Sequence, residues 1–329
     1  MQSGDDVFET VRIGTRGSKL SLWQANHVAD LIRDCHGDRP VEIKIYRTRG
    51  DENQNMALPL IGGKGLFTEA LENALRRREI DFAVHSLKDL PVENADGLTI
   101  GAVPKRGDHR DGLLSRSGCA LAQLPTGARL GTGSLRRRAQ LLALRPDLRM
   151  LDIRGNVPTR IDKLMMDDGP YDAIVLAAAG LNRLGLADHI SEVLDTTQMI
   201  SAAGQGALAV QCRDDGDSLA FLARVADLQT AQAIEAERTF LHALGGGCSL
   251  PVGAYAYVKD NRLLMRGRVT SLDGRRQIDV AGEAHVFDGP SGVFAARQLG
   301  TSLAQETLEK GGRQILDSIA PGALSAGEE

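Results

Sequence analysis

The chain of 329 residues is poor in aromatic side chains, which make up 4% of it. A protein that binds single-stranded nucleic acid needs such rings for the bases to stack on. The chain also lacks a large excess of charge of one sign, because it has 39 Lys and Arg and 43 Asp and Glu, which gives a net charge of -4. No overall basic field attracts nucleic acid, so any basic cluster must act locally. We therefore expect no nucleic-acid partner.

Long apolar runs and closely spaced cysteines are also absent. No segment approaches the length of a membrane span, and the acidic start MQSGDDVFET lacks the charged and apolar regions of a signal peptide. The four cysteines never form C-x-x-C, and the seven histidines show no metal spacing. These absences argue against a zinc site and a disulfide framework. They predict a cytoplasmic protein with no membrane association and no metal.

Two Gly-rich stretches are similar to nucleotide-binding loops but depart from them. GTGSLR has Arg136 where G-x-G-x-x-G has its third glycine, and GGKG lacks the Ser or Thr that follows the P-loop lysine. The triplet HRD at 109–111 is similar to a kinase motif, but Gly112 follows it and no D-F-G lies downstream. We interpret the triplet as a coincidence and disfavour nucleotide binding.

Hydrophobic patterns predict alternating strands and helices up to about residue 212. A break rich in Pro, Gly and charge at 101–112 separates two such stretches, and a Gly-rich break near 200 precedes an apolar strand that could return the chain to the first domain. The expected strands are 11–14, 41–47, 81–86, 128–134, 148–155 and 171–179.

Three helices are expected where apolar residues recur at helical spacing. Their predicted apolar faces are Leu20, Trp23, Val28 and Leu31; Phe67, Leu71 and Leu75; and Leu135, Ala139 and Leu142. Ser134 is the predicted N-cap of the third helix, which puts Arg136 to Arg138 in its first turn. The helix dipole is positive at this end and the arginines repel one another, so the sequence predicts an anion among them.

The pattern changes after about Thr230. A helix at 231–244 precedes three strands within 252–286, with turns at Asp260-Asn261 and Asp273-Gly274, and a closing helix spans roughly 295–316. The sequence therefore predicts a small α+β domain after two α/β domains. The expected boundaries are 7–104 with 205–224 for domain 1, 105–204 for domain 2, 225–320 for domain 3, and flexible tails at 1–6 and 321–329.

Arginines recur beside glycine turns just after the predicted strands, where ligands bind in α/β sheets. They are Arg16, Arg136, Arg137, Arg154, Arg160 and Arg183, and Lys64 lies in a further Gly-rich loop. Any one of them alone would more often be a solvated surface residue. Because guanidinium groups pair with carboxylates and phosphates, their recurrence favours a ligand that carries several such groups.

Asp89 and Cys248 each admit a structural and a functional interpretation. Asp89, in HSLKD, would remain ionised among cations and stabilise positive charge on a substrate, or it would cap a helix or pair with Lys88. Cys248, in GGGCSLPVG, would be an inert buried thiol, or a covalent tether presented on a glycine loop. Local chemistry leaves both choices open.

Eight stretches, in this order and spacing, closely resemble the hydroxymethylbilane synthase family, also called porphobilinogen deaminase. They are TRGSKLSLWQA, GGKGLF, AVHSLKDLP, GTGSLRRRAQL, IRGNVPTR, AAGLNRLGL, GQGALAV and GGGCSLPVGAYA. The resemblance covers about residues 10 to 320. It implies two periplasmic-binding-protein-like (type II) α/β domains around a cleft, a small α+β C-terminal domain, and a monomer in the cytoplasm.

The resemblance also implies the reaction and its cofactor. Four porphobilinogen molecules are deaminated and joined head-to-tail onto a covalently bound dipyrromethane primer, and hydrolysis releases hydroxymethylbilane. The acetate and propionate side chains of the pyrroles would then be the anions that the arginines meet. The expected partners are porphobilinogen and the growing polypyrrole chain.

The site residues that the resemblance implies fall into three groups. Asp89 is the catalytic carboxylate, which stabilises the cation formed as ammonia leaves. Cofactor-binding positions are Cys248 (the covalent thioether), Ser86, Lys88, Thr132, Ser134, Arg136, Arg137, Arg160, Arg183 and Gly206. Substrate-binding positions are Arg16, Ser18, Gln24, Lys64, Phe67, Arg154 and Gln205.

Three residues depart from the family pattern, and a second function class competes with the first. Gly133 stands at a usual serine, Pro158 at a usual glycine and Ser201 at a common proline, and none of the three removes a catalytic group. The alternative is a two-lobed binding protein that holds a polycarboxylate ligand without catalysis. A binding protein of this kind would be expected to carry a secretory signal, and its function would not require a cysteine flanked by glycines.

Overall fold

The computed structural model describes residues 8–47, 68–247 and 250–319. The chain forms two compact units, the first from residues 1–108 and 206–231 and the second from residues 109–205 and 232–329. The predicted tails at 1–6 and 321–329 lie outside the described residues. The division into three domains with the boundaries given above stays a prediction.

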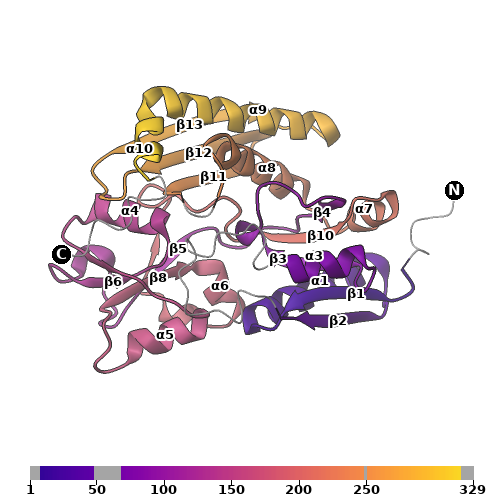
Figure 1. The fold of residues 1–329 in the computed structure, drawn as a ribbon, viewed down its shortest axis with the longest axis horizontal. Coiled ribbons are helices and arrows are strands. Elements are labelled where there is room, and N and C mark those ends of the chain that lie inside the picture. The colour runs from indigo at the N-terminus through magenta and orange to yellow at the C-terminus, as the bar shows by residue number, and fades with distance from the viewer. Residues whose placement is uncertain (1–7, 48–67, 248–249, 320–329) are drawn as a thin grey trace. The chain divides into compact units, whose positions relative to one another are not determined.

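The first unit contains a mixed five-stranded sheet with the strand order β2-β1-β3-β10-β4 (Figure 1). Strand β1 runs parallel to β2 and β3, whereas β10 is antiparallel to β3 and β4. The late strand β10 therefore returns the chain to the first sheet, as the Gly-rich break predicted. The elements are β1 (Val11–Arg16), α1 (Lys19–His36), β2 (Val41–Tyr46), α3 (Glu69–Arg76), β3 (Phe82–Ser86), η1 (Leu87–Asp89), β4 (Leu98–Ala102), β10 (Leu208–Arg213) and α7 (Gly216–Leu222).

Helix α1 packs on this sheet through a face that agrees with the predicted one only in part. Ala25, Val28, Ala29 and Ile32 are fully buried, whereas Trp23 is 37% exposed and stacks on His27. Of the predicted face, Val28 is confirmed and Leu31 packs against the core, whereas Trp23 is wrong, because small alanine side chains let the helix approach the sheet closely. In α3 the predicted Leu71 and Leu75 are fully buried, and Phe67 lies outside the described residues.

The second unit contains a sheet of the same kind, with the order β7-β6-β8-β5-β9. Strand β6 is parallel to β7 and β8, and β5 is antiparallel to β8 and β9. The three strands predicted here are confirmed as β6, β7 and β8, whereas β5 and β9 were not predicted. The elements are β5 (Asp111–Ser115), η2 (Leu121–Gln123), β6 (Arg129–Gly131), α4 (Leu135–Leu144), β7 (Arg149–Leu151), α5 (Val157–Met165), β8 (Ala173–Ala177), α6 (Ala178–Arg183), η3 (Ala187–His189) and β9 (Glu192–Leu194).

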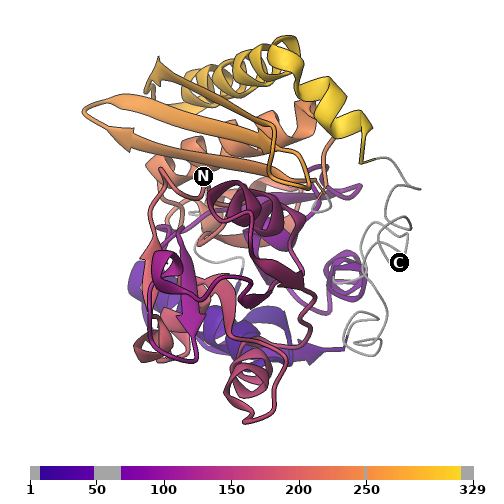
Figure 2. The same ribbon diagram turned by 90° about the vertical axis from the view of Figure 1, so that its left-hand side faces the viewer.

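A three-stranded antiparallel sheet, β11-β12-β13, completes the second unit. Figure 2 shows helix α9, in yellow, lying along this orange sheet, where Leu299 and Leu303 of α9 face Gly282 of β13. The turn at Asp260-Asn261 has φ values of 51° and 57°, as expected for a two-residue hairpin. The elements are α8 (Leu228–Ala243), of which residues 228–231 belong to the first unit, β11 (Val252–Lys259), β12 (Arg262–Thr270), β13 (Gln277–His285), α9 (Gly289–Thr307), the π-helical turn η4 (Leu308–Gly312) and α10 (Arg313–Asp317).

The closing helix differs from its predicted span of 295–316. It begins earlier, at Gly289, where a Pro in the first turn favours a helix start that the apolar pattern alone does not mark. It is also interrupted, because Gly311 adopts a φ of 98° between α9 and α10. Glycine is the residue that takes this left-handed conformation without a steric cost.

The β12–β13 turn packs against helix α4. Gly274 in this turn has a φ of 76°, and a Cβ atom there would lie 2.4 Å from the backbone nitrogen of Ala143 in α4. In the same region Arg268 of β12 donates through Nη1 to Gln140 Oε1 of α4 at 3.3 Å. The three-stranded sheet and the helix that begins with the arginine triplet are thus joined by direct contacts.

The predicted fold class is confirmed: two mixed α/β sheets and a smaller α+β part are present. No helix in the described part of the chain is long and apolar enough to cross a membrane.

Candidate active site

In the first unit, predicted site residues come from the carboxyl ends of neighbouring parallel strands. Arg16 is the last residue of β1, and Ser86 is the last residue of β3. Gln24, which is 2% exposed on α1, donates through Nε2 to Ser86 Oγ at 2.8 Å. This buried amide orients the Ser86 hydroxyl at the edge of the sheet. A direct contact of Gln24 with substrate stays a prediction.

Ser18 supports the same edge by capping helix α1. Its Oγ accepts a hydrogen bond from the backbone nitrogen of Ser21 at 3.1 Å and lies 2.8 Å from Ser21 Oγ. The cap fixes the start of the helix directly after Arg16. The structure therefore shows a capping role for Ser18, and its substrate contact stays a prediction.

Lys88 and Asp89 lie in the 3-10 turn η1 that follows β3. The Asp89 side chain is exposed and makes no hydrogen bond or ion pair with any residue that the structure describes. Neither structural alternative for Asp89, a helix cap or an ion pair with Lys88, is therefore seen in this part of the chain. Asp89 presents a carboxylate to solvent at the end of a buried strand, where a ligand can reach it.

The strand that carries Asp89 toward the site contains a buried neutral histidine. His85 is 7% exposed, and its Nε2 lies 3.1 Å from Gln211 Oε1 on β10. Burial lowers the pKa of His85 to about 4, which the hydrogen bond to Gln211 partly opposes. At neutral pH the imidazole is therefore uncharged, and it links β3 to β10 just before Ser86.

Gly206 lies where the chain enters β10. It has a φ of 85°, and a Cβ atom there would lie 2.8 Å from the carbonyl oxygen of Gly107. The backbone nitrogen of Gly107 also donates to the carbonyl oxygen of Gly206 at 3.1 Å. This close approach and the positive φ both require glycine. A contact of Gly206 with the cofactor stays a prediction.

In the second unit, strand β6 leads through Thr132 and Ser134 into helix α4. Thr132 Oγ1 accepts a hydrogen bond from the backbone nitrogen of Ser134 at 3.2 Å. Ser134 Oγ accepts one from the backbone nitrogen of Arg137 at 3.4 Å, so the predicted N-cap is confirmed. Both hydroxyls shape the start of the helix that carries the arginines.

The arginine triplet in the first turn of α4 is divided between the interior and solvent. Arg136 and Arg137 are 4% and 6% exposed, whereas Arg138 points to solvent. The predicted face of this helix was wrong in part, because Leu135 and Leu142 are only half-buried. The helix turns two arginines inward because an internal carboxylate receives them.

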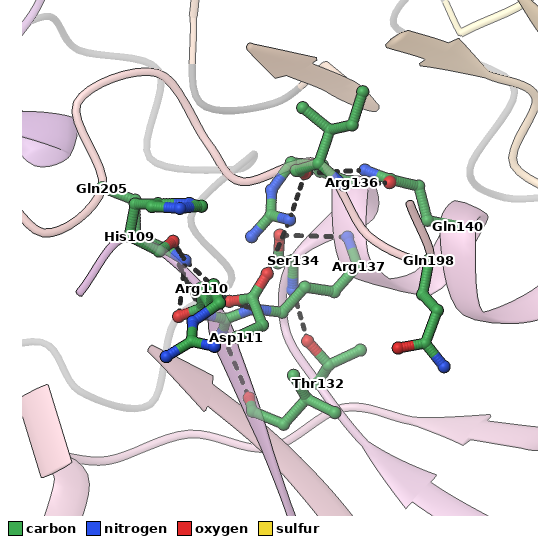
Figure 3. A network of polar contacts seen from close by, with 12 residues as sticks. His109, Arg110, Asp111, Thr132, Ser134, Arg136, Arg137, Gln140, Gln198 and Gln205 are labelled. Atoms are coloured by element: carbon green, nitrogen blue, oxygen red, sulfur yellow. Dashed lines mark hydrogen bonds and ion pairs between the residues drawn. The ribbon is translucent and has the colours of Figure 1, made fainter. Parts of the chain in front are cut away.

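That carboxylate belongs to Asp111, which lies between the two arginines (Figure 3). Asp111 Oδ2 accepts a hydrogen bond from Arg136 Nη1 at 2.8 Å. Asp111 Oδ1 accepts from Arg137 Nε at 2.9 Å and from Arg137 Nη2 at 2.7 Å. Asp111 begins β5, which is antiparallel to β8, so it lies at the edge where the parallel strands end. The protein itself thus supplies one anion for these arginines.

The charges of this cluster do not cancel. Burial alone would raise the pKa of Asp111, but Arg136 and Arg137 outweigh it and hold that pKa well below its ordinary value. Two guanidinium groups and one ionised carboxylate leave a net charge of +1 (2 − 1) among these three residues. Within the described residues Arg136 Nε is also buried without an acceptor. A further carboxylate would be stabilised beside such a cluster.

Gln205 and Gln140 complete the network around the cluster. Gln205, fully buried, donates through Nε2 to Asp111 Oδ1 at 2.8 Å and to the carbonyl oxygen of His109 at 2.8 Å. Gln140 donates through Nε2 to the carbonyl oxygen of Ile200 and accepts through Oε1 from its backbone nitrogen. Arg136 Nη1 also donates to the carbonyl oxygen of Ile200 at 2.8 Å. Gln205 thus supports Asp111, and its predicted contact with substrate stays a prediction.

The other predicted arginines of this unit follow the remaining parallel strands. Arg154 comes after β7, Arg160 lies in α5, and Arg183 ends α6 after β8. All three side chains are half-buried, and burial lowers the pKa of Arg183 to about 10. Arg160 Nε donates to the carbonyl oxygen of Gly155 at 2.7 Å, which ties it to the turn before α5. Together with Arg136 and Arg137 after β6, these arginines bring guanidinium groups to segments that follow three successive parallel strands, β6, β7 and β8.

Cys248, Lys64 and Phe67 lie outside the described residues. Of the cysteines that are described, Cys212 is fully buried on β10, and burial raises the pKa of its thiol to about 12. Because the thiolate is the nucleophile, Cys212 is unsuited to form a covalent bond with a cofactor. No group of three or more potential metal ligands occurs within the ranges that the structure describes.

The three departures from the family pattern have different surroundings. A Cβ atom at the exposed Gly133 would lie 3.4 Å from the carbonyl oxygen of Ile153, an ordinary contact. Pro158 lies in the first turn of α5, where proline is tolerated. Ser201 is 1% exposed, and its hydroxyl has no partner among the residues described. Only Ser201 thus carries a local energetic cost.

The residue that sequence reasoning missed is Asp111. It is the third residue of the triplet HRD, which the sequence analysis interprets as a coincidence. The signal that could have found Asp111 is the surplus of charge in the first turn of α4, because buried arginines need a buried counter-charge. Sequence alone does not say that strand β5 carries it there.

The fold and this cationic edge define an α/β protein with guanidinium groups at the carboxyl ends of its parallel strands, which is where ligands bind in such sheets. Comparison with known proteins gives the family. Residues 11–220 match the family model described as "Porphobilinogen deaminase, dipyromethane cofactor binding domain", and residues 231–309 match the C-terminal domain of porphobilinogen deaminase. The chain belongs to the porphobilinogen deaminase family, and it contains that family's dipyrromethane cofactor-binding domain.

Similar proteins cover nearly the whole chain. Porphobilinogen deaminase of Syntrophomonas wolfei is 47% identical over 310 residues, which is 94% of this chain and 98% of that protein. Porphobilinogen deaminase of Citrifermentans bemidjiense is 43% identical over 327 residues, 98% of this chain and 99% of that protein. Among solved structures, a YaeC family lipoprotein of Enterococcus faecalis is similar over 70% of this chain and 96% of its own, with a TM-score of 0.40 and 14% identity.

Proposed function

We propose that this chain deaminates porphobilinogen and joins four such molecules head-to-tail onto a covalently bound dipyrromethane primer, and that hydrolysis releases hydroxymethylbilane. The family membership supports this reaction. The single observation that carries it is the exposed Asp89 carboxylate, which has no partner within the described part of the chain. A carboxylate kept without a structural partner at a strand end is available for substrate.

Asp89 would act on the positive charge that develops when ammonia leaves the aminomethyl carbon of porphobilinogen. A fixed carboxylate stabilises such a charge without having to reorganise during the reaction. The same oxygens can accept hydrogen bonds from pyrrole N–H groups and so orient the ring. Lys88 and Ser86, on the same segment, would hold the cofactor beside it.

The chemistry of the donors fits a cofactor with acetate and propionate side chains. The Arg136, Arg137 and Asp111 cluster keeps a net positive charge, and Arg136 Nε has no acceptor among the described residues. Further proposed binding residues are Thr132, Ser134, Arg160, Arg183 and Gly206 for the cofactor, and Arg16, Ser18, Gln24, Lys64, Phe67, Arg154 and Gln205 for substrate. When bound, the dipyrromethane supplies the pyrrole carbon to which the first substrate is joined.

Cys248 is the proposed attachment point, through a thioether between its sulfur and the cofactor. Its flanking glycines would allow the thiol to be presented on a loop. Cys212 is excluded as the nucleophile by its burial and raised pKa, as shown above. The alternative, a two-lobed protein that only binds a polycarboxylate, is not favoured, because the chain matches relatives named porphobilinogen deaminase over nearly their full length.

We propose a cytoplasmic monomer that binds no nucleic acid. The support is the acidic net charge of -4 and the low aromatic content, which give nucleic acid little to bind.

The test is the intact mass of the purified protein together with porphobilinogen consumption. Wild type should exceed its sequence mass by roughly two porphobilinogen units less their ammonia, as a covalent adduct. Cys248→Ser should lack this mass and the activity, and Cys212→Ser is the matched control that keeps both. Active wild type without an adduct would contradict the covalent primer.

A further inference from the structure

The two carboxylate oxygens of Asp111 accept hydrogen bonds from two different arginines. Asp111 begins β5, pairs in register with Ala177 of β8, and its side chain is fully buried. Oδ2 accepts a hydrogen bond from Arg136, and Oδ1 accepts two from Arg137. One carboxylate thus sets the direction of two guanidinium groups relative to each other.

The two guanidinium groups are held in different ways. The Nε and Nη2 atoms form the edge that donates paired hydrogen bonds to a carboxylate. In Arg137 this edge is bound to Asp111 Oδ1, and Nη1 donates to the carbonyl oxygen of Val175 at 3.1 Å. In Arg136 both hydrogen bonds use Nη1, and the Nε–Nη2 edge has no acceptor among the residues described. Arg136 is therefore anchored at one nitrogen, with its paired-donor edge left for another carboxylate.

Stability alone does not explain this arrangement. A buried ion cluster is often no more stable than apolar side chains of the same volume, because removing the charges from water is costly. The cluster also lies at the edge where β6 and β8 end, not in the centre of the core. A role in orienting the arginines accounts for both the location and the division of the carboxylate oxygens.

We propose that Asp111 is a positioning residue that holds Arg136 and Arg137 in the directions in which they receive the carboxylate side chains of the dipyrromethane and the growing polypyrrole. This inference rests on the proposed function and names a further residue of the same site. Asp111 touches no reacting atom in this account and acts through the two arginines. It follows that the location of its carboxylate matters as well as its charge.

Asp111→Glu separates location from charge, because it keeps the carboxylate and moves it by one methylene group. We expect a folded protein whose kcat/KM for porphobilinogen falls by roughly a hundredfold, the effect of a misplacement of about 1 Å at a site. Asp111→Asn keeps the size and removes the charge, and we expect KM to rise. Asp172→Asn is the matched control, since it breaks the partly exposed pair with Arg129 in the same unit and should keep wild-type kinetics.

Kinetic constants are measured per molecule of folded protein that carries the adduct mass, with the melting temperature alongside. A merely structural Asp111 would lower the melting temperature and leave these constants unchanged. Asp111→Glu with a wild-type kcat/KM would overturn the proposal, because charge alone would then suffice. Asp111→Asn with a lower KM than wild type would also overturn it, since Asp111 would then only weaken the attraction of the arginines for carboxylates.

Should neither Asp111 variant fold, Gln205→Ala carries the test, because it removes the 2.8 Å hydrogen bond to Asp111 Oδ1 and no charge. We expect kcat/KM to fall roughly tenfold, the equivalent of one buried hydrogen bond. An unchanged kcat/KM would overturn the proposal. Wild type without adduct mass or porphobilinogen consumption would instead refute the proposed function, so the two failures are distinguishable.

Discussion

His85 on β3 donates a hydrogen bond from Nε2 to Oε1 of Gln211 on β10, at 3.1 Å and across a pair of antiparallel strands. His85 directly precedes Ser86 and the turn that carries Asp89. Because burial lowers the pKa of His85 to about 4, the imidazole fixes the end of β3 without placing a positive charge there. A measurable dependence of stability on pH follows.

The free energy of unfolding should fall as the pH is lowered from about 6.5 to about 4. In this range the unfolded chain binds a proton on His85 that the folded protein does not bind, so stability rises with pH. The contribution of this one group is on the order of 3 kcal/mol. Urea unfolding at a series of pH values measures it.

His85→Gln should remove most of this slope, because an amide does not titrate and can still bond to Gln211. His242→Gln is the matched control, since His242 is exposed on α8, and it should leave the slope unchanged. A slope that is identical in wild type and His85→Gln would show that the buried histidine is not its source.

Removing a guanidinium from the second unit should impair chain growth, and for the buried Arg136 it should also lower the stability. Arg136→Leu or Arg154→Leu is expected to impair cofactor assembly or to stall elongation, because several carboxylates must be held as the product lengthens. Intact-mass spectra during turnover measure the number of pyrrole units attached. Unchanged activity in both variants would contradict the polyanion site.

Arg136→Lys should rescue the Arg136→Leu defect only in part. The ammonium group keeps the charge but has no planar edge with two parallel donors. Elongation rates of the Lys and Leu variants are compared in the same assay. A Lys variant with the wild-type rate would show that charge alone is used.

The contact between the β12–β13 turn and α4 should contribute to stability. Gly274→Ala combines a strained φ of 76° with a Cβ atom 2.4 Å from the backbone of Ala143. Gly118→Ala is the matched control, because Gly118 has a φ of 73° and nothing within 4 Å of the added atom. We expect Gly118→Ala to cost about 1 kcal/mol and Gly274→Ala to cost at least about 1 kcal/mol more. If urea unfolding shows equal losses of unfolding free energy in the two variants, the contact between the turn and α4 does not contribute to stability.

The strands of this fold were largely predictable, but the helix faces only in part: Leu71 and Leu75 of α3 are buried as expected, whereas the face of α1 differs. Runs such as DFAVHS and YDAIVLAAA are buried on both sides of a sheet, so their apolar content marks them directly. Helix α1 buries Ala25 and Ala29 and exposes Trp23, because close packing on a sheet selects small side chains. Spacing gives the period of a helix but not which of two apolar faces lies inward.

The site was predictable where a motif fixes a local structure, as at Ser134, whose capping role is confirmed. It was not predictable where partners come from distant segments. Asp111 meets Arg136 only because β5 runs antiparallel beside β8, and pairing of this kind leaves no local pattern. The same holds for Gln24 and Ser86, which a helix and a strand bring together.

The measurement that tests the account most directly is the rate of porphobilinogen consumption by Asp89→Asn that carries its cofactor. The substitution keeps the size of the side chain and removes its charge. We predict a loss on the order of a hundredfold or more, with an unchanged melting temperature, because Asp89 makes no structural contact within the described residues. A folded Asp89→Asn protein that carries the adduct and turns over near the wild-type rate would contradict the catalytic role of Asp89.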